Sequence, residues 1–254
     1  MTPWVTRASM AAVAFALAAC AASLPPGPPV TPVTKSVTYV AIGSSDTAGI
    51  GSTDPLIDAW PQLFYRRALP LSTVYVNLAS PQSTAAQAVR DQLPEALRLS
   101  PRIVTIALGS TDVFDGVPAT TFGSELRLMI DALRSKGATM VLVANVPPLS
   151  VLPAYRACLG ASSTADSVFT CPSPTPIPTA LDAEVATYND VIASEVAATD
   201  VTLVDLHVAG QVADHNGSAA SLVSGDGWDP STAGQVEIAK VFDDAFARSQ
   251  KKKS

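Results

Sequence analysis

Five apolar segments of strand length recur along this chain, and their spacing restricts the fold more than any other feature. They cover residues 37–43, 73–79, 102–109, 139–146 and 201–207. Each is a continuous run rich in β-branched residues, which is typical of strands buried on both faces. Helical patterns fill the segments between them, over 57–68, 83–100, 120–137, 178–199 and 230–249. Strands that alternate with helices predict a parallel sheet with helices on both faces.

The pattern predicts an α/β protein with three layers, α/β/α, over residues 36–249. We expect an irregular insertion at 147–178 and a long loop at 208–230, after the fifth strand. The chain has 254 residues, 48% of them hydrophobic, which suits one substantial core. In such sheets the functional crevice lies at the carboxyl ends of the strands, so the loops that follow the strands are the places to search.

The charge distribution argues against a nucleic-acid partner. The formal net charge is −6, and the only run of positive residues is Lys251–Lys253 near the end of the chain. Nucleic-acid binding proteins carry a basic stripe or patch, which is missing from this sequence. We interpret residues 250–254 as a solvated basic tail.

Residues 1–20 have the layout of an export signal, with Arg7 before a short apolar stretch that ends in "LAAC". The ending resembles a bacterial lipobox, in which Cys20 would be acylated. Residues 21–35 are rich in proline and small residues, as in a stiff tether. We therefore expect an exported protein, lipid-anchored to the bacterial cell envelope. The alternative is an ordinary signal peptide that contains a cysteine.

Two further cysteines, Cys158 and Cys171, lie in the insertion. Export to an oxidising compartment favours a disulfide between them. A pair of free, buried thiols is the alternative, whereas a metal site would need more Cys or His residues nearby.

The loop "GSSDTAGIG" after the first strand fits none of three common glycine motifs. It has no lysine for a phosphate-binding P-loop, and its glycines do not match GxGxxG. The nucleophile elbow GxSxG requires glycine where this chain has Thr47. A serine directly after the first strand remains, placed where main-chain N–H groups could receive an oxyanion.

This loop resembles the first conserved block of the SGNH, or GDSL, hydrolases, commonly GDSLTAGxG. The resemblance extends through "NLASPQST", "IALGSTD" and "DGWDPSTAG", at 77–84, 106–112 and 226–234, and so covers essentially the whole domain. It implies a flavodoxin-like, five-stranded parallel sheet and the chemistry of a serine esterase. Ser45 matches the nucleophile and Asp226 the family aspartate. The oxyanion donors would be Ser45, Gln82 and Thr111.

The blocks also depart from the family pattern. Gln82 replaces a glycine, and its main-chain N–H could still donate if the side chain turns away. Thr111 replaces an asparagine and is a shorter donor. The most serious change is Asp229 in place of the catalytic histidine. A carboxylate of ordinary pKa, about 3.9, is a much weaker base than an imidazole near 6.5, unless burial raises the pKa.

Other residues could supply the missing base. His215 is the first candidate for a substitute, and His207, at the end of the fifth strand, is the second. Alternatively, four aspartates facing one crevice could hold Ca²⁺ or Mg²⁺; these are Asp46, Asp112, Asp226 and Asp229. We expect no cofactor and no metal.

Two functions follow from these residues. The first is a cell-envelope ester hydrolase, with Ser45 as nucleophile, Asp226 and Asp229 in the proton path, and a small-molecule, lipid or carbohydrate ester as substrate. The second is an inactive family member that binds a ligand or acts as a scaffold at the surface.

Overall fold

The computed structural model describes residues 37–138, 140–160 and 170–253. Five parallel strands form one sheet in the order β2-β1-β3-β4-β5. This order is that of flavodoxin-like folds, and it confirms the predicted α/β class. The strands are β1 (Thr38–Gly43), β2 (Val74–Asn77), β3 (Ile103–Ala107), β4 (Met140–Ala144) and β5 (Thr202–Val204).

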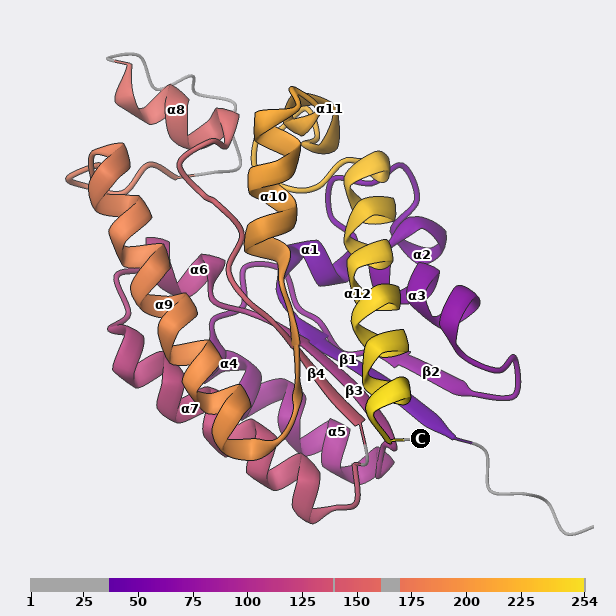
Figure 1. Ribbon diagram of the computed structural model, residues 1–254. Coiled ribbons are helices and arrows are strands. Elements are labelled where there is room, and N and C mark those ends of the chain that lie inside the picture. The colour runs from indigo at the N-terminus through magenta and orange to yellow at the C-terminus, as the bar shows by residue number, and fades with distance from the viewer. Residues whose placement is uncertain (1–36, 139, 161–169, 254) are drawn as a thin grey trace, which may run out of the picture. The chain divides into compact units, whose positions relative to one another are not determined.

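Helices cover both faces of this sheet (Figure 1). One face carries α4 (Ala85–Gln87), the π-helical turn η1 (Ala88–Gln92), α5 (Leu93–Leu99), α7 (Ala119–Ser135) and α9 (Pro178–Thr199). The other face carries α3 (Trp60–Ala68) and α12 (Thr232–Lys253). Six helices make up the rest of the helical structure in the described residues. They are α1 (Ser45–Ala48), α2 (Pro55–Asp58), α6 (Ser110–Phe114), α8 (Pro153–Leu159), α10 (Leu206–His215) and α11 (Ala219–Leu222).

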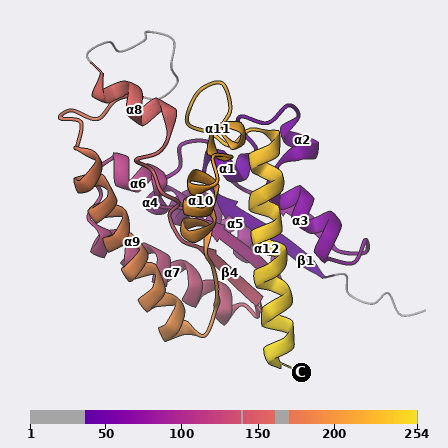
Figure 2. The same ribbon diagram turned by 45° about the horizontal axis from the view of Figure 1, so that its top comes forward.

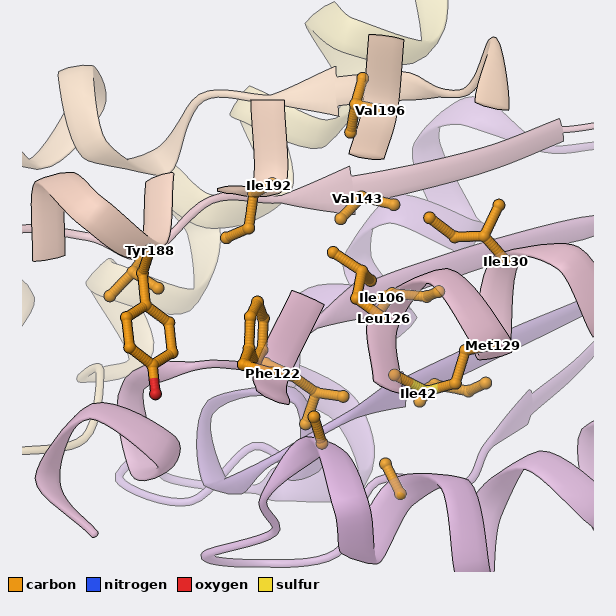
Figure 3. Packing of buried hydrophobic residues seen from close by; sticks show 14 of the residues in the cluster. Ile42, Ile106, Phe122, Leu126, Met129, Ile130, Val143, Tyr188, Ile192 and Val196 are labelled. Atoms are coloured by element: carbon orange, nitrogen blue, oxygen red, sulfur yellow. The ribbon is translucent and has the colours of Figure 1, made fainter. Parts of the chain in front are cut away.

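Alternate residues of each strand enter two different cores. Val40 and Ile42 of β1 face α7 and α9, whereas Tyr39 and Ala41 face α3 and α12. In the first core, side chains of three strands pack between those of two helices (Figure 3); they are Ile42, Ile106 and Val143, with Phe122, Leu126, Met129 and Ile130 of α7 and Tyr188, Ile192 and Val196 of α9. Burial on both faces explains why the strands read as continuous apolar runs.

Two loop predictions were wrong. The segment 208–230 is not one long loop, because it contains most of α10, which begins at Leu206, and all of α11. The Asp205 side chain accepts the Val208 N–H at 3.0 Å and so caps α10. The insertion at 147–178 is not wholly irregular either, since it holds α8. Within the described residues, no helix is both long enough and apolar enough to cross a membrane.

Candidate active site

Ser45 is the first residue of α1, directly after β1, at the carboxyl edge of the sheet. The turn before it requires glycine, because a Cβ on Gly43 would lie 2.1 Å from Thr47 Oγ1. Ser45 is only 6% exposed, and its Oγ accepts the main-chain N–H of Gln82 at 2.9 Å. The first and second sequence blocks thus meet at the Ser45 hydroxyl.

Gln82 keeps the backbone of the glycine it replaces. Its φ of 58° lies in the left-handed region that favours glycine. The Gln82 side chain is exposed, and it is not among the described residues that line the cavity beside Ser45. The larger side chain therefore turns away, and the main-chain donor still reaches Ser45.

Gln92 holds these two loops together, and our sequence reasoning missed it. Its amide accepts the Gly43 N–H at 3.0 Å, donates to the Gly43 carbonyl at 2.9 Å, and donates to Ser83 Oγ at 3.1 Å. Gln92 is 3% exposed and belongs to the π-helical turn η1. The one signal in the sequence is its place on a helical face otherwise occupied by Ala85, Ala88 and Ala96.

The side chain of Thr111 lies at the cavity but bonds to a neighbour. Thr111 Oγ1 and Ser44 Oγ are 3.1 Å apart and share a hydrogen bond. Ser44 stands where the SGNH pattern has aspartate. The two substituted residues are therefore hydrogen-bonded to each other, and either hydroxyl can be the donor.

Asp112 does not face the cavity, contrary to the expectation of four converging aspartates. It is 1% exposed, and its carboxylate oxygens accept the Ala85 N–H at 3.0 and 3.1 Å. Burial raises the pKa of Asp112 to about 6, and the bond from Ala85 opposes that rise. Asp112 thus ties α6 to the start of α4 and has a structural role.

Asp226 organises the last loop. Its Oδ1 accepts the N–H groups of Trp228 at 2.7 Å and Asp229 at 2.9 Å. This loop lies against the first one, since a Cβ on Gly51 would lie 2.6 Å from the Pro230 carbonyl oxygen and 2.9 Å from Asp229 Cβ. The close approach, together with a φ of 85° at Gly51, places Asp229 beside the Ser45 loop.

The carboxyl group of Asp229 is buried and has a raised pKa. It is 5% exposed and lines the same cavity as Ser45. Burial, the negative charges of Asp226 and Asp46, and a side-chain hydrogen bond to Asp226 together raise the pKa of Asp229 to about 7. Burial also raises the pKa of Asp46, which lines the cavity, to about 6. A carboxyl group in the place of the family histidine thus titrates near neutral pH.

The two histidines lie outside this arrangement. His207 Nδ1 hydrogen-bonds with the Val146 carbonyl oxygen at 3.0 Å, and its Nε2 lies 3.1 Å from Gln211 Nε2. His215 is exposed in the last turn of α10. Neither is among the described residues that line the cavity; the titratable groups that do line it with Ser45 are Asp46, Asp229 and Glu237, and of these Asp229 stands in the histidine position of the family pattern.

A cavity of about 190 Å³ opens beside Ser45. Its lining includes residues at the ends of β1, β3 and β4 and residues of α10, α11 and α12. Figure 2 shows these three helices near one another. The lining is largely apolar, with polar groups mainly at the strand ends. An apolar pocket with a few convergent polar groups is typical of a small-molecule site.

Two further sequence predictions concern cysteines and metals. Cys158 and Cys171 form a disulfide, with their Cα atoms 5.6 Å apart. Cys20 lies outside the described residues. Across 37–138, 140–160 and 170–253, no three His, Cys, Asp or Glu side chains are grouped so that they could hold a metal ion.

Comparisons with known proteins identify the relatives of this chain. The model of the GDSL-like lipase/acylhydrolase family matches residues 41–236. None of the curated proteins compared matches the chain.

Solved structures of esterases and lipases share the fold. The psychrotrophic esterase EstA from Pseudoalteromonas sp. is 16% identical, with a TM-score of 0.60 over 84% of this chain and 98% of that one. The extracellular lipase from Streptomyces rimosus is 17% identical, with a TM-score of 0.59 over 83% and 100%. The lipase/acylhydrolase from Enterococcus faecalis is 20% identical, with a TM-score of 0.59 over 82% and 93%.

The family model spans every block that forms the cavity edge, from the end of β1 to the start of α12, and the sheet order agrees with it. On these grounds, this chain belongs to the GDSL-like lipase/acylhydrolase family.

Proposed function

We propose that this protein is a slow serine ester hydrolase in which Asp229 takes the place of the family histidine. The observation that carries the proposal is the shared cavity of Ser45 and Asp229, a buried serine hydroxyl and a carboxyl group whose pKa is about 7. A general base works best when its pKa lies near the operating pH. Family membership supplies the reaction class, and the cavity supplies room for the substrate.

The proposed reaction proceeds in two steps. Ionised Asp229 accepts the Ser45 proton, directly or through a water, while Ser45 Oγ attacks the ester carbonyl carbon. The N–H groups of Gln82 and Ser45 donate to the carbonyl oxygen as it becomes negative. Asp229 then gives the proton to the departing alcohol, and a water releases the acyl group from Ser45 by the same route.

The reaction is expected to be slow because the third oxyanion donor is weak. Thr111 has a shorter side chain than the family asparagine and is hydrogen-bonded to Ser44, and the loss of one oxyanion donor costs about 10²–10³-fold in kcat. Rates well below those of a histidine-containing esterase are therefore part of the proposal.

Hydrolysis of a short-chain aryl ester tests this function. We expect a burst of one alcohol equivalent per Ser45 followed by slow turnover, and both should vanish in Ser45→Ala. Val212→Ala, an exposed change on α10, serves as the matched control and should behave as the unmodified protein. Turnover that persists in Ser45→Ala would rule out Ser45 as the nucleophile.

A second candidate is a binding protein that has kept the pocket and lost the chemistry. The bond between Thr111 and Ser44 favours it, because that bond holds the Thr111 hydroxyl, which was expected to stabilise the oxyanion, against a neighbouring side chain. A folded protein that binds esters in this cavity without any Ser45-dependent hydrolysis would identify this second function.

We also propose that the protein is exported and lipid-anchored to the cell envelope through Cys20, on the basis of residues 1–35 alone. Metabolic labelling with a radioactive fatty acid should mark the full chain and not the Cys20→Ser variant. Equal labelling of both would refute the anchor.

A further inference from the structure

The cavity beside Ser45 continues as a cleft between two helices, α10 and α12. On α10 the lining residues Leu206, Ala209 and Ala213 recur at helical spacing, and on α12 Ile238 and Val241 do the same. We call the space lined by these five residues the helix cleft. The views in Figure 1 and Figure 2 both show α10 next to α12 above the carboxyl edge of the sheet.

The helix cleft is apolar, whereas the polar groups of the cavity lie at the strand ends. Leu206 and Ala213 are buried, and all five members of the helix cleft are hydrophobic. Glu237, the charged lining residue of α12, is exposed and bonded to Lys240 at 2.6 Å. Asn145 lines the cavity too, but its amide pairs with Asp205 and with the His207 N–H. An alkyl chain in the helix cleft would therefore meet hydrocarbon.

The small residues of α10 make this room. Ala209 and Ala213 line the cleft, while Val208 and Val212 of the same helix are exposed, at 51% and 57%. One water needs roughly 10–15 Å³ of such a cavity, and a methylene group is close to a water in size, so the whole cavity of about 190 Å³, the space at Ser45 included, has room for on the order of ten methylene groups. The dimensions suit a medium-length chain.

We propose that the helix cleft binds the acyl chain of the ester and limits its length to about ten carbons, with Ala209 and Ala213 as the residues that set the limit. The proposal rests on the proposed function for one point, that the ester carbonyl lies at Ser45. The acyl chain stays attached to Ser45 between the two chemical steps, so apolar space next to Ser45 has to accommodate it during that time. The alcohol, in contrast, departs into water.

Binding in the Ser45→Ala background tests the cleft apart from the chemistry. The ligands are methyl esters of straight-chain acids of about 2–14 carbons, and the readout is the fluorescence of Trp228, which lines the cavity. Trp228→Phe checks that this residue is the reporter. We expect Kd to fall about fourfold per methylene, up to on the order of ten carbons, and then to level off.

Three variants in this background locate the chain. Ala209→Phe fills the cleft and should move the levelling point down to about five carbons. Val241→Ala, on the α12 side of the cleft, should lengthen the chain at which Kd levels off by about one or two carbons. Val212→Phe adds the same ring to the exposed side of α10 and should leave it unchanged.

Two results would overturn the proposal. One is a length dependence in Ala209→Phe equal to that in Val212→Phe, and the other is affinity independent of chain length in the Ser45→Ala protein. Hydrolysis by the Ser45-containing protein is measured in parallel. Length-dependent binding without hydrolysis contradicts the proposed function and supports the cleft, whereas hydrolysis with length-independent binding contradicts only the cleft.

Discussion

Replacement of Asp229 by asparagine probes the role of this carboxyl group most informatively. The two side chains have nearly the same shape, so the cavity keeps its form while the ionisable group disappears. A positioned general base contributes about 10²–10⁴-fold. We therefore expect Asp229→Asn to reduce the Ser45-dependent rate of aryl ester hydrolysis by about that factor at pH 8.

The pH dependence of kcat/KM gives a second quantitative test of Asp229 as the base. With a pKa of about 7, the ionised fraction of Asp229 rises from about one tenth at pH 6 to about nine tenths at pH 8. Because the base acts in its ionised form, kcat/KM should rise about ninefold over this range. The rise should be absent in Asp229→Asn. Asp46→Asn removes a charge that raises the pKa of Asp229, so it should shift the rise to lower pH.

Asp229→Asn should also stabilise the fold at high pH. A raised native-state pKa means that Asp229 contributes stability below the unfolded-state value, and that this contribution is lost as pH rises through about 7. Asparagine cannot ionise, so Asp229→Asn should raise the free energy of unfolding at pH 8 by up to about 4 kcal/mol, with little difference near pH 4.

The assays are initial-rate kinetics and urea unfolding at each pH, with Asp214→Asn as an exposed control. A pH profile in Asp229→Asn that matches the unmodified protein would refute the assignment of Asp229 as base. Equal stability of the two proteins at pH 8 and pH 4 would refute the buried, raised-pKa carboxyl group.

Three further predictions concern the support of the site. Gln82→Gly keeps the main-chain donor, so hydrolysis should stay within about twofold; a loss above tenfold would mean that the Gln82 side chain takes part. Gln92→Met leaves the buried N–H of Gly43 unpaired, while the Gly43 carbonyl keeps the Ser80 N–H, and should lower the free energy of unfolding by about 1–3 kcal/mol in urea titrations; an unchanged value would contradict this role of Gln92. Replacing Cys158 and Cys171 by serine opens a 13-residue separation and should cost about 3 kcal/mol in the same assay, whereas no cost would mean that the disulfide does not constrain the unfolded chain.

Much of the fold could be predicted from sequence because its signals are local. The three central strands β1, β3 and β4 are buried on both faces, so each appears as an apolar run whatever its neighbours are. Helix α10 was not predicted because its apolar pattern is short and its capping residue does not by itself indicate a helix. Its buried residues, Leu206 and Ala213, span only two turns, and its capping residue, Asp205, could equally begin a turn.

The site was predicted in position but not in chemistry. Spacing after β1 was enough to single out Ser45, and the last block singled out Asp229. The raised pKa of Asp229 depends on burial and on two other carboxylates, one of them about 180 residues away in the sequence. Likewise, the pairing of Ser44 with Thr111 joins two substitutions that each look like a simple loss when they are read separately.

Covalent labelling of Ser45 tests the central claim most directly. The protein is treated with a fluorophosphonate between about pH 5 and pH 9, and the adduct is measured by intact-protein mass and located by peptide mapping. The account predicts one adduct, on Ser45, whose rate of formation rises about ninefold from pH 6 to pH 8 and is absent in Ser45→Ala. A folded protein that forms no adduct on Ser45 across this range would contradict nucleophilic chemistry at this site.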